Sequence, residues 1–258
     1  MDNSHSMSSK VPFYNLEVNV LDRTSLFREL ARRVSLRDHP VSINFLNAHC
    51  FNIAQKNVNY RAALGRCTYL LNDGVGIDIA GRLVGIHFKE NLNGTDLIPE
   101  LLQFFAEKGL SVFFFGAKPE VIQEARREIA KTYPDLSIAG HCDGYDRDPT
   151  SVIDQINSSR ADALILGLGV PTQELWVDRY GSQLTRAKIC VSGGAIFDFV
   201  SGNVKRAPRL IRRLRLEWLF RLIQEPRRLF SRYILGSVLF FYHVLVRYWS
   251  SWFPTTMC

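Results

Sequence analysis

Short apolar segments alternate with longer segments of helical periodicity along most of the chain. The apolar segments predict strands at residues 41–46, 67–71, 111–115, 137–140, 163–166 and 188–191. Most of them are continuously apolar rather than alternating, which is typical of central strands buried on both faces.

The segments between these strands predict helices at residues 26–35, 76–83, 96–108, 119–132, 152–158 and 173–184. Regular alternation of strands and helices predicts an α/β fold with a Rossmann-like, mostly parallel sheet flanked by helices. In such a sheet, ligands bind above the carboxyl ends of the strands.

The pattern changes after Phe199, where the strands stop and Arg-rich helices are expected around Pro208 and Pro226. We therefore divide the chain into a Rossmann-like core at residues 1–202 and a helical, basic and apolar appendage at residues 203–258. The polar, Ser-rich residues 1–10 are expected to be disordered, and they lack the apolar centre of a secretory signal.

Positive charge is concentrated in the appendage. Residues 203–232 contain ten of the 32 Lys and Arg but only two of the 25 Asp and Glu, so this segment has a net charge of +8 and the rest of the chain has −1, which gives the total of +7. An apolar run at residues 234–246 follows, and it leads into four aromatic residues, Tyr248, Trp249, Trp252 and Phe253. The run has 13 residues, against the roughly 20 that a helix needs to span a bilayer.

A cationic segment followed by an apolar one is typical of docking on an anionic membrane surface. We expect residues 234–253 to lie on a membrane or to pack on a partner, with a short crossing as the alternative. Nucleic acid is the competing polyanion, because its phosphates attract the same arginines. The apolar, aromatic neighbour favours lipid, so the expected partners include a membrane surface and no nucleic acid, and a homo-oligomer stays open.

The sequence gives little support for a metal or another cofactor. The five cysteines lie far apart and form no C-x-x-C pair, which argues against a disulfide framework or zinc site and fits a reducing cytoplasm. Asp146-Arg147-Asp148 matches the D-x-D pattern with which many sugar transferases hold a metal, but so short a match is common by chance. We therefore expect no metal and no cofactor.

Small or polar residues follow almost every predicted strand, and these positions converge on one edge of the sheet. Glycine there lets the backbone turn tightly and approach a ligand closely. The candidates for contact with a substrate or nucleotide are Asn47, Asn72, Gly116, Gly144, Gly169, Gln173, Glu174 and Gly193.

Asp73 is the candidate catalytic residue, because it follows an apolar strand and precedes a helix. In that position its carboxylate could accept a proton from an incoming hydroxyl group. The alternative is a helix N-cap, for which Asp is among the best residues. Gln173 and Glu174, at a second strand–loop–helix junction, could bond a sugar or a base, and an ordinary turn with a cap explains them equally well.

A set of ordered motifs then suggests a family. The motifs are Asn72-Asp-Gly-Val-Gly-Ile77, Gly94-Thr-Asp-Leu97, Phe114-Phe-Gly-Ala117, Gly167-Leu-Gly-Val-Pro-Thr-Gln-Glu174, Gly193-Gly-Ala-Ile-Phe-Asp198, Gly202-Asn-Val-Lys-Arg-Ala-Pro208, Leu216-Glu-Trp-Leu-Phe-Arg221, Glu225-Pro-Arg-Arg-Leu229 and Arg232-Tyr233. Together they cover roughly residues 41–233, and their order resembles the WecG/TagA/CpsF glycosyltransferases, glycosyltransferase family 26.

The resemblance implies an inverting, metal-independent hexosyltransferase at the cytoplasmic face of the plasma membrane. Such enzymes move a sugar from a UDP-sugar to a saccharide linked to polyprenyl diphosphate, as in cell-surface or exopolysaccharide synthesis. Asp73 matches the presumed general base of the family, and Asn47 and Gln173 match its substrate-contacting residues. Four arginines of the appendage would contact diphosphate or lipid headgroups, namely Arg206, Arg221, Arg228 and Arg232.

Two positions depart from the family pattern. Phe45 stands where a Thr is frequent, and Asn91 and Asn93 stand near an element that an Arg commonly precedes. Both positions are expected near the sugar pocket, so a plain hexose such as glucose is as good a candidate donor sugar as N-acetylmannosamine. The alternatives from other classes are a non-catalytic nucleotide- or nucleic-acid-binding protein with a basic tail, and a sugar-nucleotide-binding scaffold.

Overall fold

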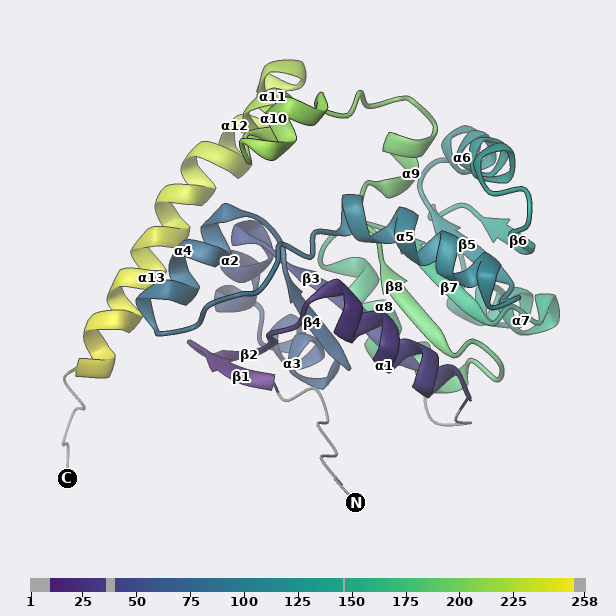
Figure 1. Cartoon of the computed structure of the whole chain (residues 1–258), viewed down its shortest axis with the longest axis horizontal. Helices are drawn as coiled ribbons and strands as arrows, with labels where there is room; N and C mark the ends of the chain where they lie inside the picture. The colour runs from purple at the N-terminus through teal and green to yellow at the C-terminus, as the bar shows by residue number, and fades with distance from the viewer. Residues whose placement is uncertain (1–9, 36–39, 146, 253–258) are drawn as a thin grey trace.

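The computed structural model describes residues 10–35, 40–145 and 147–252 (Figure 1). Its strands form a two-stranded antiparallel hairpin and a six-stranded parallel sheet in the order β4-β3-β8-β7-β5-β6. The strands are β1 (Lys10–Phe13), β2 (Leu16–Asn19), β3 (Val41–Leu46), β4 (Tyr69–Asn72), β5 (Val112–Gly116), β6 (Ile138–Cys142), β7 (Ala163–Gly167) and β8 (Ile189–Ser192).

The α-helices of the sheet layers lie between these strands. They are α1 (Arg23–Ser35), α2 (Ala48–Lys56), α3 (Val58–Arg66), α4 (Val75–Leu83), α5 (Gly94–Glu107), α6 (Pro119–Thr132), α7 (Pro149–Ser159), α8 (Thr172–Tyr180) and α9 (Ile196–Val200). The C-terminal helices are α10 (Arg209–Arg213), α11 (Glu217–Gln224), α12 (Pro226–Phe230) and α13 (Gly236–Trp252), with a π-helical turn, Ser231–Leu235, before α13.

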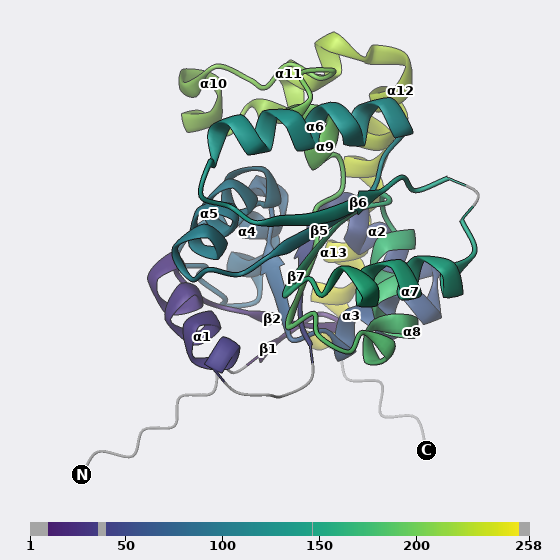
Figure 2. The ribbon, with the colours of Figure 1, turned by 90° about the vertical axis from the view of Figure 1, so that its right-hand side faces the viewer.

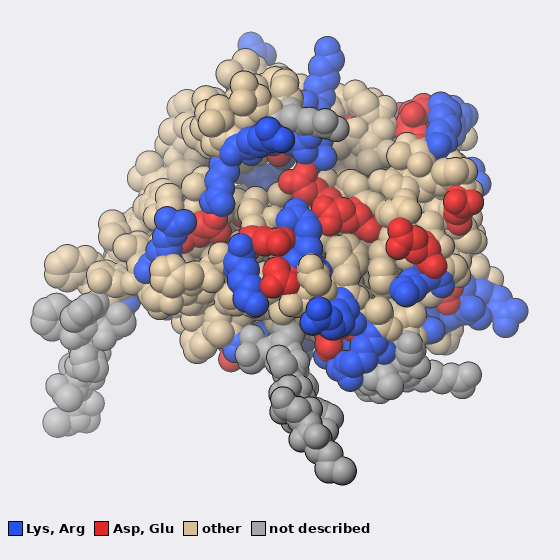
Figure 3. Space-filling model, viewed as in Figure 1, with Lys and Arg blue, Asp and Glu red and all other residues tan. Residues whose placement is uncertain are grey.

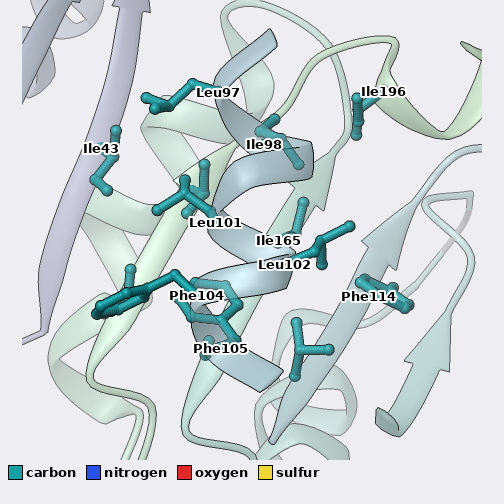
Figure 4. Packing of buried hydrophobic residues seen from close by; sticks show 14 of the residues in the cluster. Ile43, Leu97, Ile98, Leu101, Leu102, Phe104, Phe105, Phe114, Ile165 and Ile196 are labelled. Carbon is teal, nitrogen blue, oxygen red and sulfur yellow. The ribbon is translucent and has the colours of Figure 1, made fainter. Parts of the chain in front are cut away.

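Helices cover both faces of the parallel sheet (Figure 2). On one face, α1, α5, α6 and α9 enclose the largest cluster of buried apolar residues. Figure 4 shows α5 at its centre, with Leu97, Leu101 and Phe105 directed at the sheet. On the other face, α7 and α8 pack on β5 and β7, and α2 and α3 pack beside β3 and β4. The predicted α/β fold with a parallel sheet is confirmed.

Several strands run one residue past their predicted ends, into the polar and small residues that follow. Asn72 pairs with Leu46 of β3, Gly116 pairs with Gly167, and Ser192 pairs with Leu166. The parallel ladder extends to these positions because backbone pairing does not require an apolar side chain. Asn72, Gly116 and Ser192, which were expected to follow the strands, are therefore the last residues of β4, β5 and β8.

The prediction did not assign the hairpin β1–β2 or the helices α2 and α3. The hairpin begins at Lys10, whose ammonium group donates to the carbonyls of Gly65 and Cys67, so this residue is ordered. Residues 1–9, also expected to be disordered, lie outside the described residues, as does Phe253.

The appendage folds back against the core instead of standing apart. Phe240 and Val244 on α13 are fully buried and belong to the same cluster as Phe51 of α2 and Ile77 of α4. Figure 1 shows α13 running alongside α2 and α4. The segment Pro226–Trp249 forms a helix that is long and apolar enough to cross a membrane by length and composition, with a mean hydropathy of 1.6 over an 18-residue window.

Candidate active site

A cleft of about 640 Å³ lies at the carboxyl ends of neighbouring strands of the sheet. Asn47 follows β3, Asp73 follows β4, Gly167 ends β7, and Gly193 follows β8, and all four residues line the cleft. The strands β4, β3, β8 and β7 are consecutive neighbours in the sheet. The topology therefore gathers at one place residues that are far apart in the sequence.

The carboxylate of Asp73 is held by Asn47. The Asn47 side-chain oxygen accepts from the Cys50 amide and caps α2, so its nitrogen is the group that donates to Asp73 Oδ2, at 3.1 Å. The Asp73 amide donates to the Leu46 carbonyl, which fixes the backbone at the sheet edge. Asp73 Oδ1 accepts no hydrogen bond from the described residues, so one oxygen is available to a substrate.

The alternative role of Asp73 as a helix cap is not realised. Gly74 is the N-cap of α4, and no side chain caps that helix. The Gly74 amide instead donates to the side chain of Asn91, at 2.8 Å. Burial raises the pKa of Asp73, while the hydrogen bond from Asn47 and the charges of Arg232 and Arg221 oppose the rise.

Gln173 and Glu174 form a buried network at the base of the cleft. Gln173 Oε1 accepts from the Gly194 amide, and Gln173 Nε2 donates to Glu174 Oε1, both at 2.9 Å. Glu174 Oε2 is buried and has no hydrogen-bond partner among the described residues, although Glu174 lines the cleft. A buried polar atom without a partner is costly, so this oxygen is a candidate contact for a substrate.

We expect Glu174→Gln to gain stability relative to the wild type as the pH rises. Burial raises the pKa of Glu174 from 4.5 to about 7. A carboxyl whose pKa is higher in the folded chain makes folding less favourable above its unfolded pKa, and the cost levels off above its folded pKa. The neutral amide avoids that cost, which is on the order of 3 kcal/mol by pH 8. Thermal unfolding at pH 5 and pH 8 measures it, and a pH-independent difference would contradict the prediction.

Gly116 and Gly144 allow backbone segments to approach each other closely where β5 and β7 end. Gly116 has a φ of 133°, and a Cβ there would lie 2.4 Å from the carbonyl carbon of Gly167. A Cβ at Gly144 would also meet Gly116, at 3.0 Å. Gly116 and Gly144 thus shape the floor beside the cleft rather than line it, whereas Gly169 lines it directly.

Three of the four predicted arginines line the cleft. They are Arg221, Arg228 and Arg232. The Nε atoms of Arg221 and Arg232 are buried and have no hydrogen-bond partner within the described part of the chain. Figure 3 shows Lys and Arg side chains in an arc over a hollow in this face. Two guanidinium groups whose Nε atoms are buried without hydrogen-bond partners suit an anionic ligand.

Arg206 is placed differently, because it lines none of the described cavities around Asp73. Its guanidinium group pairs with Asp96, at the start of α5, and Arg212 pairs with the same carboxylate at 3.0 Å. Arg215 similarly pairs with Asp78 of α4. Asn72 also supports the site indirectly, since its side chain donates to Asp78 and to the Glu90 carbonyl. The ion pairs of Arg206, Arg212 and Arg215 hold the appendage against the core.

The prediction missed several residues that line the cleft, among them Thr95, Lys118, Tyr145 and Asn203. Thr95 is the second residue of α5, and the side chain of Asn93 caps that helix. An Asn followed by a long helical pattern is a recognisable N-cap signal. Asp198 of α9 also lines the cleft, and burial raises its pKa.

The D-x-D pattern does not form a metal centre within the described residues. Asp148 caps α7, where its side chain accepts from the Ser151 amide at 2.9 Å, and Asp146 lies outside the described residues. Across residues 10–35, 40–145 and 147–252, no group of three His, Cys, Asp or Glu could hold a metal ion.

Comparisons with known proteins bear on this site. The family model described as "Glycosyl transferase WecG/TagA/CpsF family" matches residues 11–253. An N-acetylglucosaminyldiphosphoundecaprenol N-acetyl-beta-D-mannosaminyltransferase from Bacillus spizizenii is 37% identical over 175 residues, 68% of each chain. Its counterpart from Bacillus subtilis is 36% identical over 72% of each chain, and one from Staphylococcus aureus is 27% identical over 71% of this chain and 72% of its own. The family match also takes in β2 and α13, beyond the motifs of the sequence analysis.

Proposed function

Because the chain belongs to the WecG/TagA/CpsF family of glycosyl transferases, we propose that it moves a hexose or an N-acetylhexosamine from a UDP-sugar to a lipid-linked saccharide. The acceptor is a saccharide on polyprenyl diphosphate, the class of acceptor named for the relatives. The product serves a bacterial cell-surface polymer or exopolysaccharide. The observation that carries the proposal is the Asp73 carboxylate, which Asn47 holds at the cleft with one oxygen free.

The proposed reaction inverts the anomeric carbon. The acceptor hydroxyl oxygen attacks that carbon from the face opposite UDP, and the bond between the carbon and the diphosphate oxygen breaks. The electron pair leaves with UDP, and the hydroxyl proton passes to Asp73 Oδ1. Arg221, Arg228 and Arg232 line the cleft and would stabilise the negative charge on departing UDP, as would the N-terminus of α8. The proposed step requires no metal.

The identity of the donor sugar depends on a few residues near Asp73. Phe45 lines the cleft, and Asn91 and Asn93 line a second cavity beside Asp73, so both departures from the family pattern lie at the site. The relatives are named for transfer of N-acetylmannosamine. Phe45 puts an aromatic ring where the family often has a small hydroxyl residue, which keeps glucose as a second candidate.

We propose that the protein is a peripheral protein of the cytoplasmic membrane face. The relatives act on an undecaprenol-linked, and hence membrane-bound, substrate. Apolar residues of α13 face outward, and arginines of α10–α12 surround the cleft. Because Phe240 and Val244 of α13 pack into the core, a position on the membrane surface is favoured over a crossing.

A panel of UDP-sugars, incubated with an N-acetylglucosamine-diphosphate-lipid acceptor with and without EDTA, tests the proposal. We expect transfer from at least one donor, with unchanged rate in EDTA and inverted configuration in the product. Loss of activity in EDTA would refute metal independence. Absence of transfer from every donor, together with retention on duplex DNA at physiological salt, would favour the nucleic-acid-binding alternative.

A further inference from the structure

Three cavities meet at Asp73. The cleft of about 640 Å³, a second cavity of about 220 Å³ and a third of about 500 Å³ all include Asn47 and Asp73 in their linings. A transferase of the proposed kind must bring three chemically different groups to its base: a nucleotide sugar, a sugar diphosphate and a hydrocarbon chain. The linings of the cavities differ accordingly: arginines line the second cavity, and mostly apolar residues line the third.

The second cavity is polar and cationic. Arg212, Arg215, Arg221 and Arg232 line it, together with Asn91, Asn93, Asp73, Asp96 and Glu217. Arg212 is paired with Asp96, and Arg215 is paired with Asp78. Arg221 and Arg232 form no ion pair with any described residue, and they stack on the rings of Phe199 and Tyr233. These two arginines, which have no ion-pair partner among the described residues, suit a diphosphate group.

The third cavity is an apolar groove between α4 and α13. Its apolar lining includes Val75, Ile79, Trp218, Ile234, Phe240 and Phe241. Gly76 lies in its wall, where a Cβ would be in ordinary contact with the Phe240 ring, at 3.5 Å.

We propose that this groove between α4 and α13 binds the first isoprene units of the polyprenyl acceptor, the units nearest its diphosphate. The inference rests on the proposed function for the identity of the acceptor, but the groove itself is a separate site. A polyprenyl chain bound in this groove explains why an apolar cavity adjoins both the Asp73 carboxylate and a cluster of arginines.

The boundary between the second and third cavities supports this assignment. Trp218 and Tyr233 line both cavities, and their rings meet edge to face with centroids 6.4 Å apart. A diphosphate on the arginine side of this pair would place the attached hydrocarbon on the apolar side. Farther along α4, Leu83 and the C-cap residue Val84 are exposed apolar residues, as is Ile79 of the groove.

The chemistry of the groove favours a hydrocarbon over a peptide. Apart from Asn47, Asp73, Ser237 and the hydroxyl group of Tyr233, its lining consists of apolar or aromatic side chains and glycine. A peptide would bury backbone donors and acceptors there with few partners, which is costly. An isoprenoid has no such groups and gains by leaving water.

Photo-crosslinking of the wild-type chain tests the inference without relying on transfer. The probe is a short isoprenyl diphosphate that carries a diazirine on its first isoprene unit. We expect the label on residues 75–79 or 234–241, and we expect excess farnesyl diphosphate, but not inorganic diphosphate alone, to suppress it. A label confined to the outer face of α13 or to other peptides would overturn the inference and indicate non-specific lipid contact.

Ser237→Trp gives a second, kinetic test. An indole at this groove position should lower the ratio of kcat/KM for a polyprenyl-linked acceptor to kcat/KM for a short alkyl-linked one at least tenfold. Ser182→Trp, at an exposed position beyond α8, is the matched control and should keep the wild-type ratio. An unchanged ratio in Ser237→Trp would overturn the inference. Groove labelling without transfer from any UDP-sugar would instead refute the proposed function and leave the groove assignment standing.

Discussion

Asp73→Asn is expected to lower kcat by about 10²–10⁴-fold, the usual cost of removing a general base. A neutral amide cannot take the hydroxyl proton, while the geometry around it is preserved. The substituted side chain can present its oxygen to Asn47 Nδ2, and the Asp73 amide still donates to Leu46. Initial rates at saturating donor and acceptor measure the effect, and near-normal turnover would refute the assignment.

Asp148→Asn is the matched control for that experiment. Asp148 caps α7, and Asn is an equally good N-cap, so stability and turnover should both stay close to wild type. A large loss of turnover in this variant would revive the D-x-D motif as a metal ligand.

The pH profile adds a second expectation for Asp73. Burial raises its pKa, so the wild-type rate should fall on the acid side as the carboxylate takes up a proton, at a pH above that of an ordinary aspartate. The residual activity of Asp73→Asn should lack this acidic limb. A limb that persists unchanged would point to another titrating group, such as Asp198, whose pKa is also raised by burial.

The parallel sheet was predictable because its strands are buried on both faces and read as continuous apolar runs. The helices α2 and α3, capped by Asn47 and Asn57, were missed because both are short and the helical periodicity of their apolar residues is weak. The hairpin β1–β2 was missed for a different reason. Its inward residues, such as Phe13 and Val18, become a core only when α2 and α13 pack on them, and no local pattern records that contact.

The candidate site was predictable where its residues follow strands, as Asn47, Asp73 and Gly193 do. What the sequence could not give is the pairing between distant segments. Arg206 and Arg221 are both arginines of the appendage, yet one pairs with Asp96 and the other lines the cleft. That difference depends on how the appendage packs over α5, which is a long-range property.

The outward face of α13 is the expected site of membrane contact. Leu235, in the turn before α13, and Val238, Tyr242, Leu245 and Trp249 of α13 recur at helical spacing and are exposed, with Val238 at 68% and Trp249 at 64%. Phe240 and Val244, on the opposite side of the helix, are fully buried. One apolar side of α13 is therefore in the core, and another is exposed to solvent. The exposed side can contact a membrane, and it can be changed without disturbing the fold.

The double variant Val238→Glu/Trp249→Glu is therefore expected to leave the membrane while staying folded. Each side chain forgoes about 1.5–3 kcal/mol of apolar burial, so partitioning into anionic vesicles should fall at least 100-fold. Transfer to an acceptor in vesicles should fall with it, and transfer to a detergent-solubilised acceptor should not. Vesicle flotation and the two transfer rates measure the effect.

Deletion of residues 203–258 is a poorer test of the same idea, because it would also remove Phe240 and Val244 and uncover Phe51 in the core. Val58→Glu is the better control, since Val58 is exposed to a similar extent, at 64%, and belongs to α3 rather than to α13. If the double variant floats with vesicles as well as this control does, α13 does not form the membrane contact. The appendage arginines alone would then have to hold the protein at the bilayer, and binding should disappear at high salt.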